Sequence, residues 1–325
     1  MKNYITRQYE PNDCTLWNAF ISTAKNATFL LHRDFMEYHY HKFQDYSLMV
    51  FEGKKLVAVL PANRIEGKLF SHQGLTYGGL VFSSAVKLGK SIEILQSAMA
   101  FLQDNQIETL QLKLIPSFYT SFFSEEIEYA LFLVEATLIR RDCLSVLDLT
   151  KPFSFSKDRK KCVARGEKNN LMIKEELDFE LFWNEILIPN LDKKHSAKPV
   201  HSLEEIIKLQ QKFPKNIRHF NVYHKDKFVA GTTVFCTDTV AHPQYISGNE
   251  DKNELGSLDF LYNYLITDVF AAKNFFDFGP SHENNGKKIN EGILFWKESF
   301  GVKTIVQDYY EVKTANHLLL ENVLI

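Results

Sequence analysis

Residues 275–301 read FFDFGPSHENNGKKINEGILFWKESFG. This stretch predicts a buried strand over residues 275–278, a break at Gly279-Pro280 and a polar loop over residues 281–284. A helix follows, and its apolar residues recur at helical spacing on one face: Ile289, Ile293, Trp296 and Phe300. Enzymes with mixed sheets often place reactive groups in such a loop at a strand end, although a solvated turn would have the same pattern.

The composition indicates a folded protein with two domains. A chain of 325 residues is too long for a single ordinary core. Its hydrophobic content of 45% and charged content of 24% are those of a globular protein. The formal net charge of -2 gives no overall attraction to nucleic acid, so no DNA partner is expected and any polyanion site must be local.

The sequence predicts a cytoplasmic protein without a membrane span, a disulfide framework or a metal site. No apolar segment reaches the roughly 18 residues that a spanning helix needs, and the basic start of the chain is not followed by an apolar run. The 4 cysteines are widely separated in the sequence. His39 and His41 form an H-x-H pair, but on a helix they point about 200° apart, and no third ligand follows at a recognisable spacing.

The two halves of the chain repeat the same order of predicted elements, β-β-β-α-β. Near-constant offsets between four matched features indicate an internal duplication. The matched features are the turn and strand at 53–58 with 225–230, His72 with His242, the helices 88–103 with 258–270, and the strands 109–114 with 275–278.

Two motifs and an aromatic strand in the C-terminal half are informative about family. The motifs read D-F-G-x-S-x-E-x-x-G and then G-x-x-x-x-K-E-x-F-G. Their residues and those of the strand are Asp277, Phe278, Gly279, Ser281, Glu283, Gly286, Gly292, Lys297, Glu298, Phe300, Gly301, Asp308, Tyr309 and Tyr310. With these motifs the chain resembles the Fem-type acyltransferases, tandem-GNAT-fold enzymes that pass an acyl or aminoacyl group to an amine.

The resemblance implies an α/β (α+β) fold of two GNAT-like mixed β-sheet domains with flanking helices. We expect an N-terminal domain over residues 1–150, a C-terminal domain over 151–310, and a tail, 311–325, that packs back on the first domain. The implied activity is N-acyl transfer to a cell-envelope polysaccharide or peptidoglycan precursor. The acceptor would be a small-molecule, nucleotide-linked or lipid-linked amine, and the protein a monomer or homodimer.

A basic helix is predicted between the two halves, over residues 157–170. Lys161, Arg165 and Lys168 lie at i, i+4 and i+7 and form one basic stripe, which is either a solvated linker or an anion-binding face. Fem-type enzymes have an arginine and lysine helix at this point of the chain. The anion-binding alternative predicts a phosphate-bearing donor or acceptor here, and in some Fem-type enzymes the helix that corresponds to residues around Arg33 contacts a phosphate. The candidate substrate-binding residues are Arg33, Arg159, Arg165, Lys168, Tyr77, Ser281 and Asn290.

The donor of the acyl group stays open. In GNAT folds the loop before the helix that follows a splayed strand holds a pyrophosphate, and Gly256 and Ser257 are the candidate cofactor-binding residues at this position. Carboxylates in the same loop would repel a pyrophosphate: Glu250, Asp251 and Glu254. Acyl-CoA and aminoacyl-tRNA both remain as donors, and no bound cofactor is certain.

Four residues are candidate catalytic groups: Glu283, Asp277, His72 and His242. Glu283 is the favoured general base, because partial burial in its loop would raise its pKa towards neutrality. Asp277 has the alternative role of capping a turn, and the repeated histidines that of supporting the fold. A rival interpretation of the whole chain is a catalytically degenerate tandem-GNAT module that binds a nucleotide-linked ligand without turnover.

Overall fold

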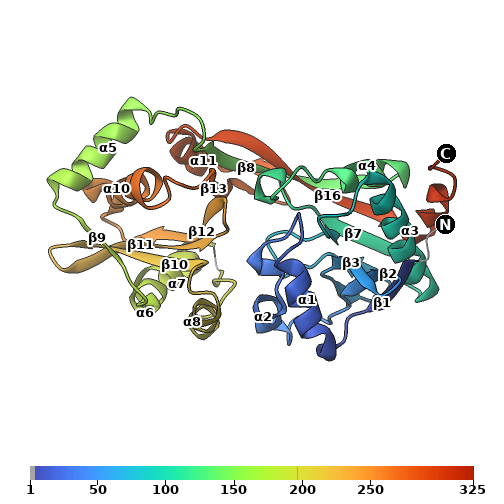
Figure 1. Cartoon of the computed structure of the whole chain (residues 1–325). Helices are drawn as coiled ribbons and strands as arrows, with labels where there is room; N and C mark the ends of the chain where they lie inside the picture. The colour runs from blue at the N-terminus through green and yellow to red at the C-terminus, as the bar shows by residue number, and fades with distance from the viewer. Residues whose placement is uncertain (1–3, 196) are drawn as a thin grey trace. The chain divides into compact units, whose positions relative to one another are not determined.

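The computed structural model describes residues 4–195 and 197–325. The chain consists of two compact units. The first unit comprises Met1–Asp142 and Val306–Ile325, and the second comprises Cys143–Ile305. Each unit contains β-strands with helices packed against them (Figure 1). The predicted fold class, two domains with mixed sheets and flanking helices, is confirmed.

The strands of the first unit begin with an antiparallel meander. β1, β2 and β3 pair in this order, and the predicted hairpin between β2 and β3 turns at Gly53, which has a φ of 62°. β7 pairs in parallel with β5 on one edge and antiparallel with β16 on the other. The bounds are β1 (Tyr4–Gln8), β2 (Leu48–Glu52), β3 (Lys55–Leu60), β4 (Asn63–Ile65), β5 (Lys68–Phe70), β6 (Val81–Phe82), β7 (Thr109–Lys113), β8 (Thr137–Asp148) and β16 (Lys303–Lys313), the last two extending into the second unit.

The core of the first unit is built around α3. This helix buries the apolar face predicted for it, which comprises Ile92, Leu95, Met99 and Leu102. The C-terminal 3-10 segment η7 contacts α3 and adds Leu320 to the same core. The bounds are α1 (Cys14–Ile21), α2 (Arg33–Met36), α3 (Leu88–Asp104), α4 (Glu126–Leu133) and η7 (Thr314–Leu320).

The second unit has a sheet of the same type. β9, β10, β11 and β12 pair antiparallel with their neighbours, β12 pairs in parallel with β13, and β13 pairs antiparallel with β8. A hairpin of β14 and β15 follows β13. The bounds are β9 (Met172–Glu175), β10 (Ile217–His224), β11 (Lys227–Cys236), β12 (Val240–Gly248), β13 (Phe275–Pro280), β14 (His282–Glu283) and β15 (Lys288–Ile289).

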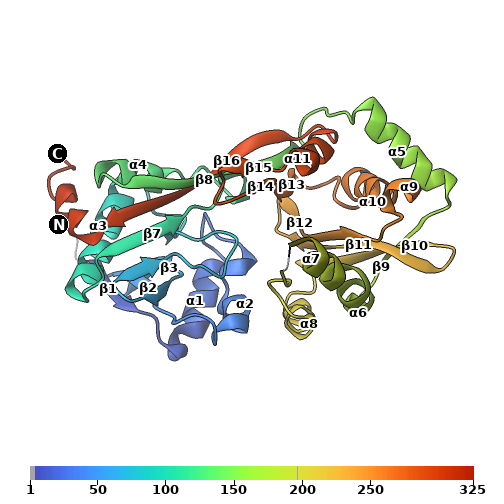
Figure 2. The ribbon, with the colours of Figure 1, turned by 180° about the vertical axis from the view of Figure 1, so that it is seen from behind.

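Helices cover both faces of this second sheet (Figures 1 and 2). α10 contacts β11 and β12 on one face, and the π-helical segment η5 contacts the same strands on the other. The bounds are α5 (Lys157–Lys168), α6 (Phe179–Leu181), η5 (Phe182–Leu187), α7 (Ile188–His195), α8 (Leu203–Lys212), α9 (Lys252–Leu255), α10 (Ser257–Tyr264), the π-helical η6 (Leu265–Val269) and α11 (Glu291–Glu298).

Both units contain the order β-β-β-α-β, which confirms the predicted duplication. The order is β2-β3-β6-α3-β7 in the first unit and β10-β11-β12-α10-β13 in the second. In each unit the chain before the helix pairs in parallel with the strand after it over a very short distance. The paired residues are Gly78 with Leu114 in the first unit, and Val240 with Phe275 and Ala241 with Phe276 in the second.

One predicted helix face is wrong in its first half. α11 begins at Glu291, and Asn290 caps it by accepting a hydrogen bond from Ile293 N at 3.1 Å. Ile289 and Ile293 are 58% and 43% exposed, whereas Lys297 is 3% exposed. Because the helix begins after Ile289, it turns a lysine towards the interior at a place where the spacing predicted an apolar face.

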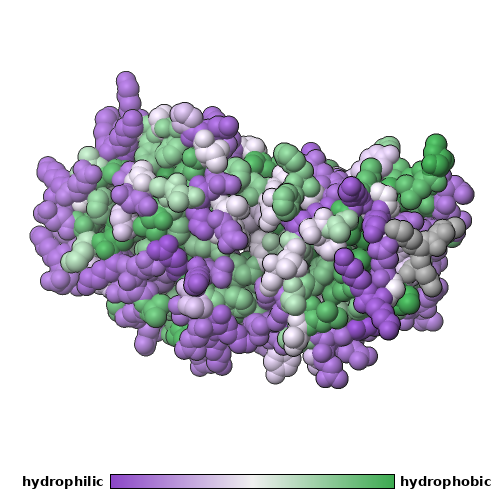
Figure 3. All heavy atoms as spheres, in the orientation of Figure 1, coloured by the Kyte–Doolittle hydropathy of each residue, from purple (hydrophilic) through white to green (hydrophobic). Residues whose placement is uncertain are grey.

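Among residues 4–195 and 197–325, no helix combines the length and the apolar composition needed to cross a lipid bilayer. Hydrophobic residues also lie on the surface, in small groups among hydrophilic ones (Figure 3). Phe123 is an example, with an exposed fraction of 96%.

Replacing Leu320 by alanine should lower the free energy of unfolding of the first unit by about 2–4 kcal/mol, because it leaves a cavity in a packed core. The neighbouring Leu319 is 46% exposed and provides a matched control. Leu319→Ala should change the same quantity by no more than about 0.5 kcal/mol. Urea denaturation of the full chain measures both variants, and equal effects would contradict the placement of Leu320 in the core.

Candidate functional site

β12 and β13 separate soon after they pair. Their parallel ladder ends at Ala241 and Phe276, although the strands continue to Gly248 and Pro280. On its other edge β13 pairs with β8, and the register there is irregular after Asp277. The strands thus diverge at a place that we name the fork, defined by His242 on β12 and by Asp277, Phe278 and Gly279 on β13.

A buried carboxylate organises the fork. Asp277 is 2% exposed, and its Oδ1 accepts a hydrogen bond from Gly279 N at 2.8 Å. Its Oδ2 lies 3.3 Å from His242 Nδ1, which is also 2.9 Å from the Asp277 carbonyl oxygen. Because a carbonyl oxygen only accepts hydrogen bonds, the proton belongs on Nδ1, and Nε2 of neutral His242 is an acceptor. Of the four predicted catalytic residues, these two are the pair in contact.

Lys297 of α11 reaches the same fork. Its Nζ donates to Gly279 O at 3.0 Å and to Pro280 O at 2.6 Å. Burial lowers the pKa of this lysine to about 8, while the negative charge of Asp277 acts in the opposite direction. Lys297 is absent from the site residues predicted from the sequence. Two signals were available: its place in the motif G-x-x-x-x-K-E-x-F-G, and its position four residues after Ile293 on a helix face expected to be apolar.

Ser281 and Asn290, both predicted to bind substrate, meet at the base of the β14–β15 hairpin. The Ser281 carbonyl oxygen accepts a hydrogen bond from Asn290 N at 2.9 Å. The Ser281 side chain is buried, and its Oγ has no hydrogen-bond partner among the residues that the structure describes. A buried hydroxyl without a partner can donate to or accept from a ligand.

Glu283 lies elsewhere than its assignment as general base requires. It is exposed on β14, opposite Lys288 of β15, so the expected partial burial is absent. The hairpin turns through Asn284, Asn285 and Gly286, which have φ values of 50°, 53° and 84°. This tight turn keeps both short strands at the surface, and the carboxylate with them.

His72 and Tyr77 are buried in the first unit. The His72 ring stacks on His39 with centroids 5.1 Å apart, and its Nδ1 accepts a hydrogen bond from Gly74 N at 3.2 Å. Burial, with a smaller contribution from His39, lowers the pKa of His72 to about 3. Tyr77 is 2% exposed, and its hydroxyl lies 2.8 Å from Thr28 Oγ1. Neutral, packed side chains of this kind support the fold.

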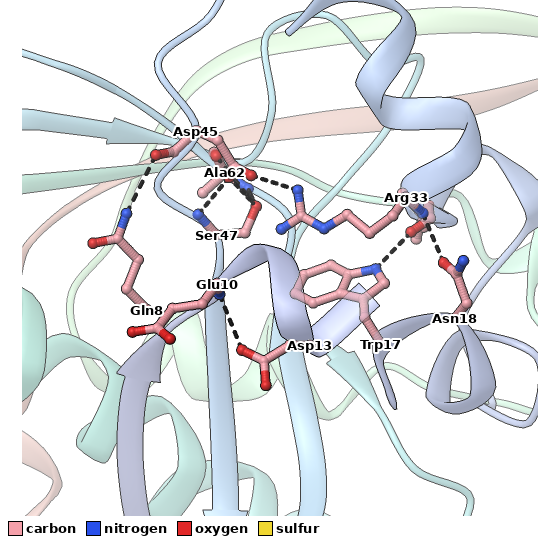
Figure 4. A network of polar contacts seen from close by, with 10 residues as sticks. Gln8, Glu10, Asp13, Trp17, Asn18, Arg33, Asp45, Ser47 and Ala62 are labelled. Carbon is pink, nitrogen blue, oxygen red and sulfur yellow. Dashed lines mark hydrogen bonds and ion pairs between the residues drawn. The ribbon is translucent and has the colours of Figure 1, made fainter. Parts of the chain in front are cut away.

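Arg33 lies against two aromatic rings in the first unit, and Figure 4 shows one of them, that of Trp17. Its guanidinium carbon lies 3.4 Å from the ring centre of Tyr9 and 4.3 Å from that of Trp17. Its Nη1 donates to Asp45 at 2.5 Å, while Nε and Nη2 have no hydrogen-bond partner in the described parts of the chain. A ligand phosphate would have to compete with Asp45 for this cation.

The basic helix α5 divides into an internal and an exposed part. Arg159 is buried, pairs with Asp259 and donates from Nε to Ser299 Oγ at 2.8 Å. Arg165 and Lys168 are exposed on the same helix. The predicted phosphate-binding set therefore contains one arginine that anchors α5 and two cations that face solvent.

The predicted cofactor residues lie between α9 and α10. Gly256 has a φ of 70°, and a Cβ at this position would lie 2.4 Å from the Cys162 carbonyl oxygen on α5. Glycine is required there because α5 and the start of α10 approach so closely. Ser257 is fully buried, and its Oγ has no hydrogen-bond partner among the described residues.

Solved structures share this architecture. FemX matches with a TM-score of 0.65 over 94% of this chain and 96% of its own, at 8% identity. The chain has the fold of FemX. L-PGS from Bacillus licheniformis matches with a TM-score of 0.57 over 97% of this chain and 96% of its own, at 10% identity. The C-terminal domain of a putative lysylphosphatidylglycerol synthetase from Agrobacterium fabrum matches with a TM-score of 0.55 over 81% and 83% of the two chains, at 12% identity.

The likeness to FemX confirms the predicted Fem-type resemblance at the level of the fold. No family model matches the sequence, and no curated protein matches it.

Gly279→Ala should destabilise the second unit by about 1–2 kcal/mol, because Gly279 has a φ of 70° that costs an L-residue this much. The added Cβ would also lie 3.2 Å from His242 Cε1. Gly292→Ala is the matched control: its Cβ meets nothing nearer than Asn290 Oδ1 at 3.7 Å, within a helix where alanine is favoured by about 0.5–1 kcal/mol. Urea denaturation should give changes of opposite sign, and changes of the same sign would contradict the described fork.

Proposed function

We propose that the chain is an acyltransferase that passes an acyl or aminoacyl group to an amine, with its reaction centre at the fork. The carrying observation is the buried Lys297 ammonium at the end of β13, beside the Asp277 carboxylate. The fold shared with FemX, with L-PGS and with a domain of a putative lysylphosphatidylglycerol synthetase supports this proposal.

Lys297 is assigned to the carbonyl oxygen of the donor. When the amine nitrogen bonds to the carbonyl carbon, negative charge develops on that oxygen and must be held by fixed donors. A lysine ammonium has three N–H groups, and two of them are directed at Gly279 O and Pro280 O. The third is available to the oxygen, and Asp277 favours the charged form that this role needs.

His242 is assigned to the proton of the amine. Its Nδ1 is held by Asp277, so Nε2 can take the proton that the attacking nitrogen loses as the new C–N bond forms. The bond from the carbonyl carbon to the leaving oxygen or sulfur then breaks, and the leaving group takes up a proton. In this proposal Asp277 orients His242, and the unpartnered Ser281 hydroxyl positions the substrate.

The proposed donor is an activated ester that needs no pyrophosphate site before α10. Glu250, Asp251 and Glu254 are all exposed in that loop, and like-charge contacts there would oppose acyl-CoA bound in the usual GNAT manner. Aminoacyl-tRNA fits this constraint better than acyl-CoA does. The proposed acceptor is an amine on a cell-envelope precursor, which places the reaction in the cytoplasm.

Lys297→Met should reduce the transfer rate by about 10²–10³-fold, as expected when a donor to a developing oxyanion is removed. Lys303→Met, at an exposed position of β16, is the matched control and should leave the rate unchanged. The measurement is amide formation from aminoacyl-tRNA and, separately, from acetyl-CoA, with a panel of amine-bearing envelope precursors. A wild-type rate for Lys297→Met would remove this residue from the reaction.

The transfer rate should fall as the pH rises through about 8, because the required Lys297 ammonium loses its proton there. Lys297→Arg keeps its charge to above about pH 12 and should remove this alkaline decline. A pH profile of the rate measured on both proteins tests this assignment. An unchanged decline in the arginine variant would mean that another group titrates.

The second candidate function is a degenerate module that binds a nucleotide-linked ligand without turnover. The exposure of Glu283, the base expected from the sequence, favours it. Native mass spectrometry of the purified chain separates the two functions. A retained nucleotide-linked ligand that survives incubation with aminoacyl-tRNA and acetyl-CoA unchanged would support the module and contradict the enzyme.

A further inference from the structure

Three adjacent strands of the first unit, β7, β16 and β8, bring a polar cluster together. Lys113 of β7 lies directly opposite Tyr309 of β16 in the antiparallel ladder, with its Nζ 5.4 Å from the centre of the tyrosine ring. The guanidinium carbon of Arg140, on β8, lies 4.6 Å from the same ring centre. The Tyr309 hydroxyl donates to Asp142 Oδ2 at 2.9 Å. Two cations thus lie against one half-buried tyrosine, which is fixed by a buried carboxylate.

The charges of this cluster do not balance. Asp142 accepts hydrogen bonds from Arg140 Nε at 2.6 Å and from Nη2 at 2.8 Å, so these two charges compensate each other. Lys113 is half-buried, and its Nζ donates to the Leu75 carbonyl oxygen at 3.2 Å. No carboxylate among residues 4–195 and 197–325 forms an ion pair with Lys113. A partly desolvated ammonium without a counter-charge is unfavourable until an anion joins it.

We infer that Lys113, backed by Tyr309 and Arg140, forms a binding site in the first unit for the phosphate group of a ligand. The guanidinium group of Arg140 is already bound by Asp142. The site therefore offers the point charge of Lys113 and not the two parallel donors that suit a planar carboxylate. A lysine point charge is a common partner for phosphate. This inference stands independently of acyl transfer at the fork.

The ionisation of Lys113 agrees with such a site. Burial lowers the pKa of Lys113 to about 8; Asp142 acts against this shift and Arg140 adds to it. A bound phosphate would supply the missing negative charge and raise this pKa again. The shift on binding therefore provides a signal specific to this one side chain.

Isothermal titration calorimetry at pH 7 and low salt tests the site with three probes. Inorganic phosphate tests the anion alone, glycerol 3-phosphate stands for a lipid headgroup, and a nucleoside diphosphate for a nucleotide-linked ligand. Lys113→Met should weaken binding of the best probe about tenfold or more, because it removes a charged partner. Lys113→Arg should restore part of the affinity, and added salt should weaken wild-type binding.

Lys68→Met is the matched control. Lys68 is also a paired residue of a first-unit strand, opposite Thr109, but its side chain is 51% exposed and its Nζ lies 3.4 Å from Glu311 Oε2. Its loss should change the affinity by no more than roughly twofold. The melting temperatures of both methionine variants without ligand show that each is folded, since methionine retains the length of the lysine stem.

Nuclear magnetic resonance of ¹³C-methylated lysines provides the second readout. A rise in the pKa of Lys113 on addition of the probe, without a comparable rise for Lys297, is the expected result. Absence of phosphate binding to the wild-type chain, equal binding by Lys113→Met, or a rise confined to Lys297 would each overturn the inference. The last result would place the anion at the fork instead.

Discussion

The buried carboxylate of Asp277 is the constraint on which the fork depends. Its oxygens contact the Gly279 amide and the His242 ring, and its negative charge raises the pKa of Lys297 against the effect of burial. A buried carboxylate with fewer partners would be protonated or would draw water in. Gly279 completes the arrangement because its left-handed backbone turns the chain over Asp277 without a side chain against His242. One acidic residue thereby fixes a histidine and the path of a strand, and its charge favours the ammonium form of Lys297.

His72 and His242, which the sequence pattern matches, differ in place and role: His242 lies on β12, whereas His72 lies between β5 and β6. In the second unit β12 leaves β13 after two paired positions, and His242 stands at the opening. In the first unit the corresponding edge of β7 is paired with β5, and a Cβ at Gly78 would lie 1.8 Å from the Ser71 carbonyl oxygen. In the first unit, therefore, the chain itself lies beside β7, and no opening like the fork is described there. His72 lies in this segment, and its ring stacks on His39 as part of the packed interior.

Local patterns predicted the elements of the fold well. The β2–β3 hairpin, the apolar face of α3, the strand at 275–278 and the duplicated order all follow from turn residues and periodicity, which depend on neighbours in the sequence. The site was less predictable, because its contacts join distant residues. Arg159 contacts Asp259, and Lys297 contacts the end of β13. Neither contact can be predicted from the spacing of residues along the sequence. The burial expected for Glu283 was wrong, because nothing local distinguishes a buried carboxylate in a loop from an exposed one in a hairpin.

The first unit consists of two separate segments of the chain, and this affects the order in which the two units can fold during synthesis. Val306–Ile325 belongs to the first unit although the whole second unit, Cys143–Ile305, precedes it in the chain. This last segment contributes a strand beside β7, the buried amide of Gln307 that donates to Leu114 O at 3.0 Å, and the core residue Leu320. N-terminal domains generally fold first as a chain leaves the ribosome. Here the unit that is made first stays incomplete until residues 306–325 have been made, so the second unit can fold before the first is complete.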